Sequence, residues 1–316
     1  MDPNADRAGS KPVSDRRPHG IAAALCALAV LANAAPARAG AEGRGLPAPV
    51  SGVGEVRATY LRFSDPNGDV LQGGEARDLW AVGADASIDV AFGDVHVQAD
   101  LGGDAGTRTR RADDTYEGSF GAAVHANVRD FRLGAIGVFG SLGRLAIHDL
   151  DARDPHSNVW SIGLEGAAFF PRATVVAQAG YLDRTHSRGA DPDALESGRL
   201  ARGELRWFPR DTVRLAAGAG YVGGRMDDDD DHVWVIDWLG EAEALVPGSR
   251  VAGFVRYAGG YYHQSDDTDS LVEHRVVFGL RAYFGEATLI AHDRDGATFE
   301  APRALEWNGV IAGPLE

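Results

Sequence analysis

The amino-acid sequence predicts an all-β protein, a single twelve-stranded antiparallel up-and-down barrel that crosses a membrane. Three observations predict it. Long segments alternate apolar and polar residues with period two, tight turns and long loops alternate strictly between those segments, and no segment between them has a convincing helical period.

Composition excludes several other classes of protein. Of the 316 residues 44% are hydrophobic, which is too many for a disordered chain. The single Cys cannot build a disulfide scaffold, and no apolar run after the N-terminal region is long enough for a membrane-spanning helix. The net charge of -15 repels phosphate, so nucleic acid is not an expected partner.

The first 39 residues have the organisation of a secretory signal peptide. Basic residues at 16–17 precede a short apolar run over 21–35, and residues 37–39 supply an Ala-Arg-Ala cleavage pattern. A core helix or a membrane anchor is the alternative, but the run is short and a Pro closes it. We expect residues 1–39 to be removed, which takes away the only Cys and leaves 40–52 as an N-terminal periplasmic segment.

The predicted strands follow from the alternation. In the clearest segment, Trp80, Val82 and Ile88 fall on one face, while Asp85 and Asp89 fall on the other. The pattern recurs over about 53–63, 78–92, 95–103, 116–128, 131–143, 158–170, 173–183, 199–208, 212–222, 232–246, 250–262 and 272–284. Gly-rich sequence blurs the two faces of the fifth segment.

The connections favour a barrel over a soluble sandwich. Tight turns are expected at 93–94, 129–130, 171–172, 209–211 and 247–249, and long loops at about 64–77, 104–115, 144–157, 184–198, 223–231 and 263–271. All tight turns then lie on one side of the membrane, the periplasmic side. Because the number of strands is even, the first and last residues of the barrel segment, 53–284, lie on that side too. Sandwich strands usually have about five or six residues, whereas these segments have the length that a tilted strand needs to cross a bilayer.

Aromatic residues near the strand ends complete the pattern, among them Trp80, Phe92, Trp160 and Phe284. In these features residues 40–284 resemble the porin-like outer-membrane β-barrel proteins of Gram-negative bacteria. The resemblance implies an outer-membrane location after export by a cleaved signal peptide. It also implies outer-membrane lipid, lipopolysaccharide and the barrel-assembly machinery as partners.

The C-terminal residues 285–316 differ in composition from the barrel. They follow the last strand, whereas proteins of the resembled class usually end in that strand. This tail could extend into the periplasm or fold back over the barrel mouth, and the extension is the favoured prediction.

Charged residues on the inward face are the first candidates for function. The predicted pore-lining residues are Asp85, Asp89, Asp100, Arg202, Glu204, Arg206, Arg214, Arg256, Arg275 and Arg281. The arginines at 202, 206 and 214 would face the aspartates at 85, 89 and 100 across the ring, and the resulting transverse field would orient polar solutes. The alternative is that these charges pair locally and fill a narrow lumen, which the position of Glu204 between two arginines favours.

The long loops are rich in carboxylates, which are ligands for Ca²⁺ or Mg²⁺. Candidate metal ligands are Asp65, Asn67 and Asp69, which start like a calcium loop, and Asp228 and Asp230 in a run of aspartates. The calcium pattern lacks the Gly at its sixth position and the Glu at its twelfth. Solvated acidic loops are the simpler interpretation, and no other cofactor is expected.

Neighbouring Asp and His residues at the loop ends raise the possibility of hydrolysis, since these groups can activate water. The pairs are His148 and Asp149, Asp154 and His156, Asp183 and His186, Asp231 and His232, and His263 and Asp266. No Ser joins them at a recognisable spacing, and acidic loops produce such neighbours by chance.

The sequence thus predicts a narrow channel for ions or small polar solutes rather than an enzyme. The alternatives are a non-conducting structural or adhesive barrel with cation-binding acidic loops, and an outer-membrane hydrolase with an Asp/His rim site.

Overall fold

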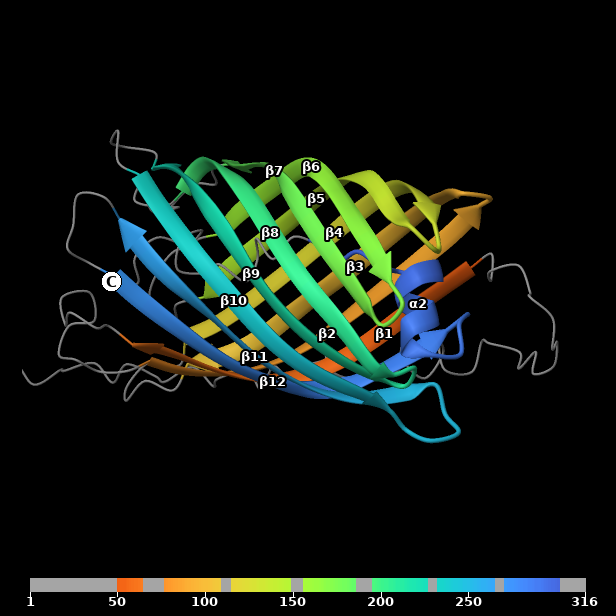
Figure 1. Cartoon of the computed structure of the whole chain (residues 1–316). Coiled ribbons are helices and arrows are strands. Elements are labelled where there is room, and N and C mark those ends of the chain that lie inside the picture. The colour runs from red at the N-terminus through yellow and green to blue at the C-terminus, as the bar shows by residue number, and fades with distance from the viewer. Residues whose placement is uncertain are drawn as a thin grey trace, which may run out of the picture.

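A computed structural model describes residues 50–64, 77–108, 115–148, 156–185, 195–226, 232–264 and 270–301. Twelve strands form one closed barrel, in which each strand pairs with its neighbours in sequence and β1 pairs with β12 (Figure 1). The strands are β1 Val50–Ser64, β2 Arg77–Phe92, β3 Val95–Arg108, β4 Thr115–Asp130, β5 Gly134–His148, β6 His156–Phe170, β7 Ala173–Thr185, β8 Leu195–Arg210, β9 Val213–Met226, β10 His232–Leu245, β11 Val251–Gln264 and β12 Ser270–Phe284.

Closure of the sheet is antiparallel and in register. Glu55 of β1 is opposite Asp85 of β2 on one side and Arg281 of β12 on the other. A closed sheet gives the backbone groups of both edge strands partners, which is the condition for placing a sheet in hydrocarbon. The predicted fold class and strand number are confirmed.

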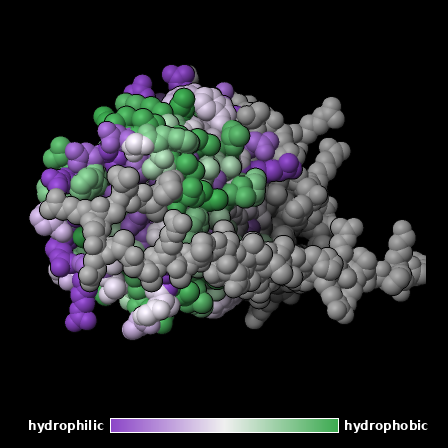
Figure 2. Space-filling model, turned by 90° about the vertical axis from the view of Figure 1, so that its right-hand side faces the viewer, coloured by the Kyte–Doolittle hydropathy of each residue, from purple (hydrophilic) through white to green (hydrophobic). Residues whose placement is uncertain are grey.

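The outer face of the barrel is apolar. Ile136, Leu142 and Leu164 are 72%, 69% and 67% exposed, although they belong to regular strands. In Figure 2 hydrophobic residues cover much of the visible barrel surface, and hydrophilic residues gather mainly at the left of the view. Exposed apolar side chains in this number suit contact with lipid tails rather than with water.

The fifth strand starts later than the alternation predicts. Its turn was expected at 129–130, but residues 131–133 form it and β5 begins at Gly134. The Asp130 carboxylate accepts hydrogen bonds from the backbone N–H groups of Arg132 at 2.8 Å and Leu133 at 3.3 Å. This side-chain cap favours a turn after Asp130 rather than at it.

The described part of the tail, residues 285–301, does not extend away from the barrel, which differs from the favoured prediction of a periplasmic extension. After Gly285, whose φ of 92° suits glycine, residues 286–301 turn back into the short-turn end and form helix α2, Leu289–Asp295 (Figure 1). Thr288 caps this helix by accepting a hydrogen bond from the Ala291 N–H at 3.2 Å. Within the described ranges, no helix is both long and apolar enough to cross a membrane.

Candidate functional site: the lumen and its tail

Residues 285–301, which we call the tail plug, are anchored in the lumen by a buried carboxylate. Asp293 accepts hydrogen bonds from Arg206 at 2.7 Å and from the Thr174 hydroxyl at 2.6 Å. Arg206 also donates to Glu204 and to the Thr298 carbonyl, both at 2.7 Å. Arg206, Asp293 and Thr298 are all at most 3% exposed, so these charge-assisted bonds are made out of contact with water.

A second set of contacts holds the backbone of the tail plug. Arg129 of β4 donates to the carbonyls of Gly296 at 2.6 Å and Arg294 at 3.1 Å. Gln98 of β3 exchanges hydrogen bonds with the backbone of Phe299, and Gln178 of β7 donates to the Glu300 carbonyl at 3.0 Å. The tail therefore contacts strands on different sides of the ring.

His125 of β4 contacts both the strand carboxylates and the tail plug. Its Nδ1 is 2.8 Å from Glu165 and its Nε2 is 2.9 Å from Asp100, and the ring is fully buried. The Phe299 ring stacks on it with centroids 6.1 Å apart and planes 11° apart. Each ring nitrogen faces a carboxylate, which suits an imidazolium that donates a hydrogen bond from both nitrogens. These two bonds fix the plane of the His125 ring on which Phe299 stacks.

A charged layer, which borders the same cavity as the tail plug, lines the lumen. Arg57 of β1 pairs with Asp104 at 2.6 Å, with Glu55 at 3.0 Å and with Asp85. Gly83 and Gly102, which are inward-facing positions beside these carboxylates, have no Cβ that would collide with Asp104 and Asp85. The glycines thus make room for the acidic side chains that the arginine gathers.

The other half of the charged layer is centred on Arg281. It donates to Glu55 and Glu241 at 2.7 Å and to Glu243 at 2.8 Å. Arg214 and Arg256 also pair with Glu241, at 2.5 and 2.7 Å. The network links β9, β10, β11, β12 and β1 and balances positive with negative charge.

All ten predicted pore-lining residues lie on the inward face, but they pair differently from the predicted arrangement. The arginines at 202 and 206 bind Glu204 and the tail, and Arg214 binds β10. Asp85 pairs with Arg57, and Arg275 pairs with Glu273. Asp89 contacts His96, and Asp100 contacts His125. The ion pairs are thus made along the wall and with the tail.

Sequence reasoning missed the tail residues Asp293, Phe299 and Glu300 as members of the lumen. Their only signal was composition: a short segment with charged and apolar residues after a strand that already closes the barrel. The alternation of the sequence also predicts inward positions for Gln98, Gln178 and His125, but nothing in the sequence indicates which groups they hold.

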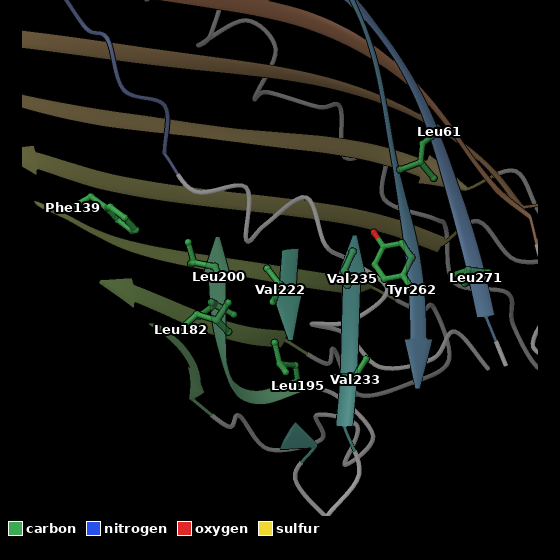
Figure 3. Close-up of a cluster of buried hydrophobic side chains, with 11 residues drawn as sticks. Leu61, Phe139, Leu182, Leu195, Leu200, Val222, Val233, Val235, Tyr262 and Leu271 are labelled. Atoms are coloured by element: carbon green, nitrogen blue, oxygen red, sulfur yellow. The ribbon is translucent and has the colours of Figure 1, made fainter. Parts of the chain in front are cut away.

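Toward the long-loop ends of the strands, the inward face becomes apolar. We call this surface the apolar arc. It consists of Leu61, Val159, Leu182, Leu200, Val222, Val235, Tyr262 and Leu271. These side chains come from the consecutive strands β6 to β12 and from β1, and they are at most 8% exposed. In Figure 3 all of them except Val159 are labelled, and the labelled side chains lie on the inner side of the barrel wall.

A cavity of about 200 Å³ lies between the tail plug and the wall. Thr298 and Phe299 border it on the tail side, Arg57 and Arg281 border it in the charged layer, and Val159 connects it to the apolar arc. The cavity in the lumen is therefore lined by both charged and apolar side chains.

The other candidate residues fall outside this site. The proposed metal ligands at 65, 67, 69, 228 and 230 lie outside the described residues, as does at least one side chain of every Asp/His pair. Among the residues that the structure describes, no group of three or more His, Cys, Asp or Glu side chains could hold a metal ion.

Replacing Arg57 by Met should destabilise the barrel by about 3 kcal/mol, because it breaks a largely buried ion pair and removes the charge that Asp85 and Asp104 share. Urea unfolding midpoints measure the effect. The matched control is Arg62→Met on the exposed face of the same strand, and equal values for both variants would contradict the prediction.

No protein-family model matches the chain, and no curated protein matches it. Among solved structures, an outer-membrane channel from Pseudomonas putida F1 matches with a TM-score of 0.52 and 12% identity, covering 78% of this chain and 100% of that one. The translocator domain of autotransporter NalP from Neisseria meningitidis matches with a TM-score of 0.49 and 16% identity, covering 84% and 98% of the two chains. The likeness to the Pseudomonas putida channel shows that the chain has an outer-membrane β-barrel fold.

Proposed function

We propose that the protein is an outer-membrane channel for ions or small polar solutes, and that the tail plug holds it closed at the short-turn end. The observation that carries the proposal is the insertion of residues 285–301 into a lumen lined by charged side chains. A barrel that served only as a scaffold or an adhesin would need neither a polar lumen nor a segment across it.

The bonding of the tail supports a closed resting state. Charge-assisted hydrogen bonds from Arg206 and Arg129 are worth roughly 1.5–3 kcal/mol each. Two of them would keep the open state well below one molecule in a hundred if opening broke both. The balanced charges of the wall then supply polar surface for a solute once the tail moves.

Planar-bilayer recording tests the proposal directly. The purified chain should show rare current steps of uniform size at moderate voltage, because opening requires displacement of the tail plug. Absence of steps from the full chain and from a chain that ends at Gly285 would leave the structural or adhesive alternative.

A further inference from the structure

The cavity between the tail plug and the wall has one basic and one acidic side. Arg214 of β9 and Arg256 of β11 border it on one side, and Asp85 of β2 and Asp104 of β3 border it on the other. Because the strands of the closed barrel follow sequence order, β9 lies half the ring away from β3. The cavity volume of about 200 Å³ corresponds to roughly seven water molecules, so a small solute has room there.

On the basic side, guanidinium groups border the cavity while their counterions do not. Arg214 and Arg256 pair with Glu241 at 2.5 and 2.7 Å, and Arg214 also pairs with Glu243 at 2.8 Å. Both glutamates are buried and neither borders the cavity, whereas both arginines do. The tail carboxylate Glu300 borders the cavity too, but an arginine of β8 pairs with it. A solute therefore meets positive charge on this side.

The basic side also holds hydrogen-bonding groups that nothing in the described chain uses. His292 of the tail plug packs against Tyr283 of β12, borders the cavity and is 6% exposed. Neither of its ring nitrogens has a hydrogen-bond partner among the described residues, and the same holds for Nε of Arg214. Burial lowers the pKa of His292, and among the neighbouring charges that of Arg214 lowers it most, which indicates a positive potential at the ring. An imidazole N–H beside a guanidinium suits a carboxylate.

On the acidic side, carboxylates are the most accessible charges. The side chains of Asp85 and Asp104 are 40% and 32% exposed, whereas the arginines that border the cavity are at most 13% exposed. A single guanidinium, that of Arg57, pairs with both aspartates, so one positive charge faces two negative charges. Ser87 and Ser119 border the cavity as well. Carboxylates and hydroxyls are acceptors for an ammonium group, which donates three hydrogen bonds.

We propose that the cavity binds a small zwitterion, a solute with a carboxylate at one end and an ammonium group at the other. The carboxylate lies against His292 and Arg214, and the ammonium group lies against Asp85 and Asp104. The inference rests on the proposed channel function for the solute's role as cargo. It narrows the class of solute from ions and polar molecules in general to those that carry both charges.

Equilibrium dialysis of the full chain in lipid nanodiscs tests the site without requiring ion flow. The probes are tritiated β-alanine, γ-aminobutyrate and δ-aminovalerate, and the competitors are the carboxylate and the amine of the same chain length. At least one amino acid should bind saturably beyond the level of empty nanodiscs. Each competitor should bind at least about tenfold more weakly, because it lacks one of the two charge-assisted interactions.

Substitutions at the two ends separate the two charges. Asp85→Asn keeps the side-chain size and should weaken binding of the amino acid about tenfold, without effect on the competing carboxylate. His292→Phe keeps an aromatic ring against Tyr283 and should weaken binding of both by about the same factor. Asp78→Asn on the outward face of β2 is the matched control and should leave affinity unchanged.

Three outcomes would overturn the proposal: no saturable binding of any amino acid, equal binding of a competitor with a single charge, or unchanged affinity in either folded variant. Circular dichroism shows whether each variant forms the barrel, and Asp85→Asn tests the site even where His292→Phe does not fold. Because binding is measured without conduction, failure here is separate from failure of the channel in bilayer recordings.

Discussion

Truncation after Gly285 should convert the barrel from rare openings to continuous conduction in planar bilayers. The cut leaves all twelve strands intact and removes α2 together with Phe299 and Glu300. The lumen then keeps its charged wall but loses the segment that crosses it, so current should increase by at least about tenfold, the effect of losing a single anchoring bond.

A single substitution should reproduce part of this effect. Asp293→Asn replaces the carboxylate that accepts from Arg206 and Thr174, and it should raise open probability about tenfold to a hundredfold. Asp295→Asn is the matched control in the same helix, because burial and Glu286 already raise the pKa of Asp295 and disfavour its charge.

For the truncation, equal conduction by the full chain and by the chain that ends at Gly285 would refute the assignment of the tail as a plug.

Acidification should open the channel below about pH 6.5. Burial, together with the charges of Arg214, Arg129, Arg206 and Arg281, lowers the pKa of His292 in the tail plug to about 3. Its edge contact with Tyr283, with centroids 4.7 Å apart, keeps it against the wall. Among the described residues, neither ring nitrogen has a hydrogen-bond partner.

The direction follows from proton linkage. The docked tail holds His292 neutral, whereas a released His292 binds a proton at its ordinary pKa near 6.5. Docking is therefore fully stable above pH 6.5 and is lost as pH falls from there toward 3, by about 1.4 kcal/mol, or tenfold, per pH unit. The raised pKa of Asp295 acts in the opposite direction, because the docked form then retains a proton.

Open probability between pH 7.5 and 5 measures the effect, with a rise of about thirtyfold expected at pH 5. His292→Gln should flatten this rise, and His274→Gln on β12 should not. His274→Gln is the control for the loss of a histidine outside the tail plug. A pH response that survives in His292→Gln would assign the opening to another group.

The fold of the barrel was predictable because it depends on local alternation. Trp80, Val82 and Ile88 on one face and Asp85 and Asp89 on the other specify a strand without reference to any partner. Turn chemistry was less predictable. The Asp130 carboxylate moved the start of β5, since a side-chain cap depends on a few hydrogen bonds rather than on a repeated pattern.

The sequence by itself determined the strands, their inward charges and the side on which the barrel ends. Only the tertiary structure decided which charges meet: Arg206 with Asp293, Arg57 with Asp104, and His125 with two carboxylates. The physical reason is that strand pairing follows sequence order, so periodicity encodes it. The tail contacts residues more than a hundred positions away, such as Gln98 and Thr174, and no repeat in the sequence records such partners.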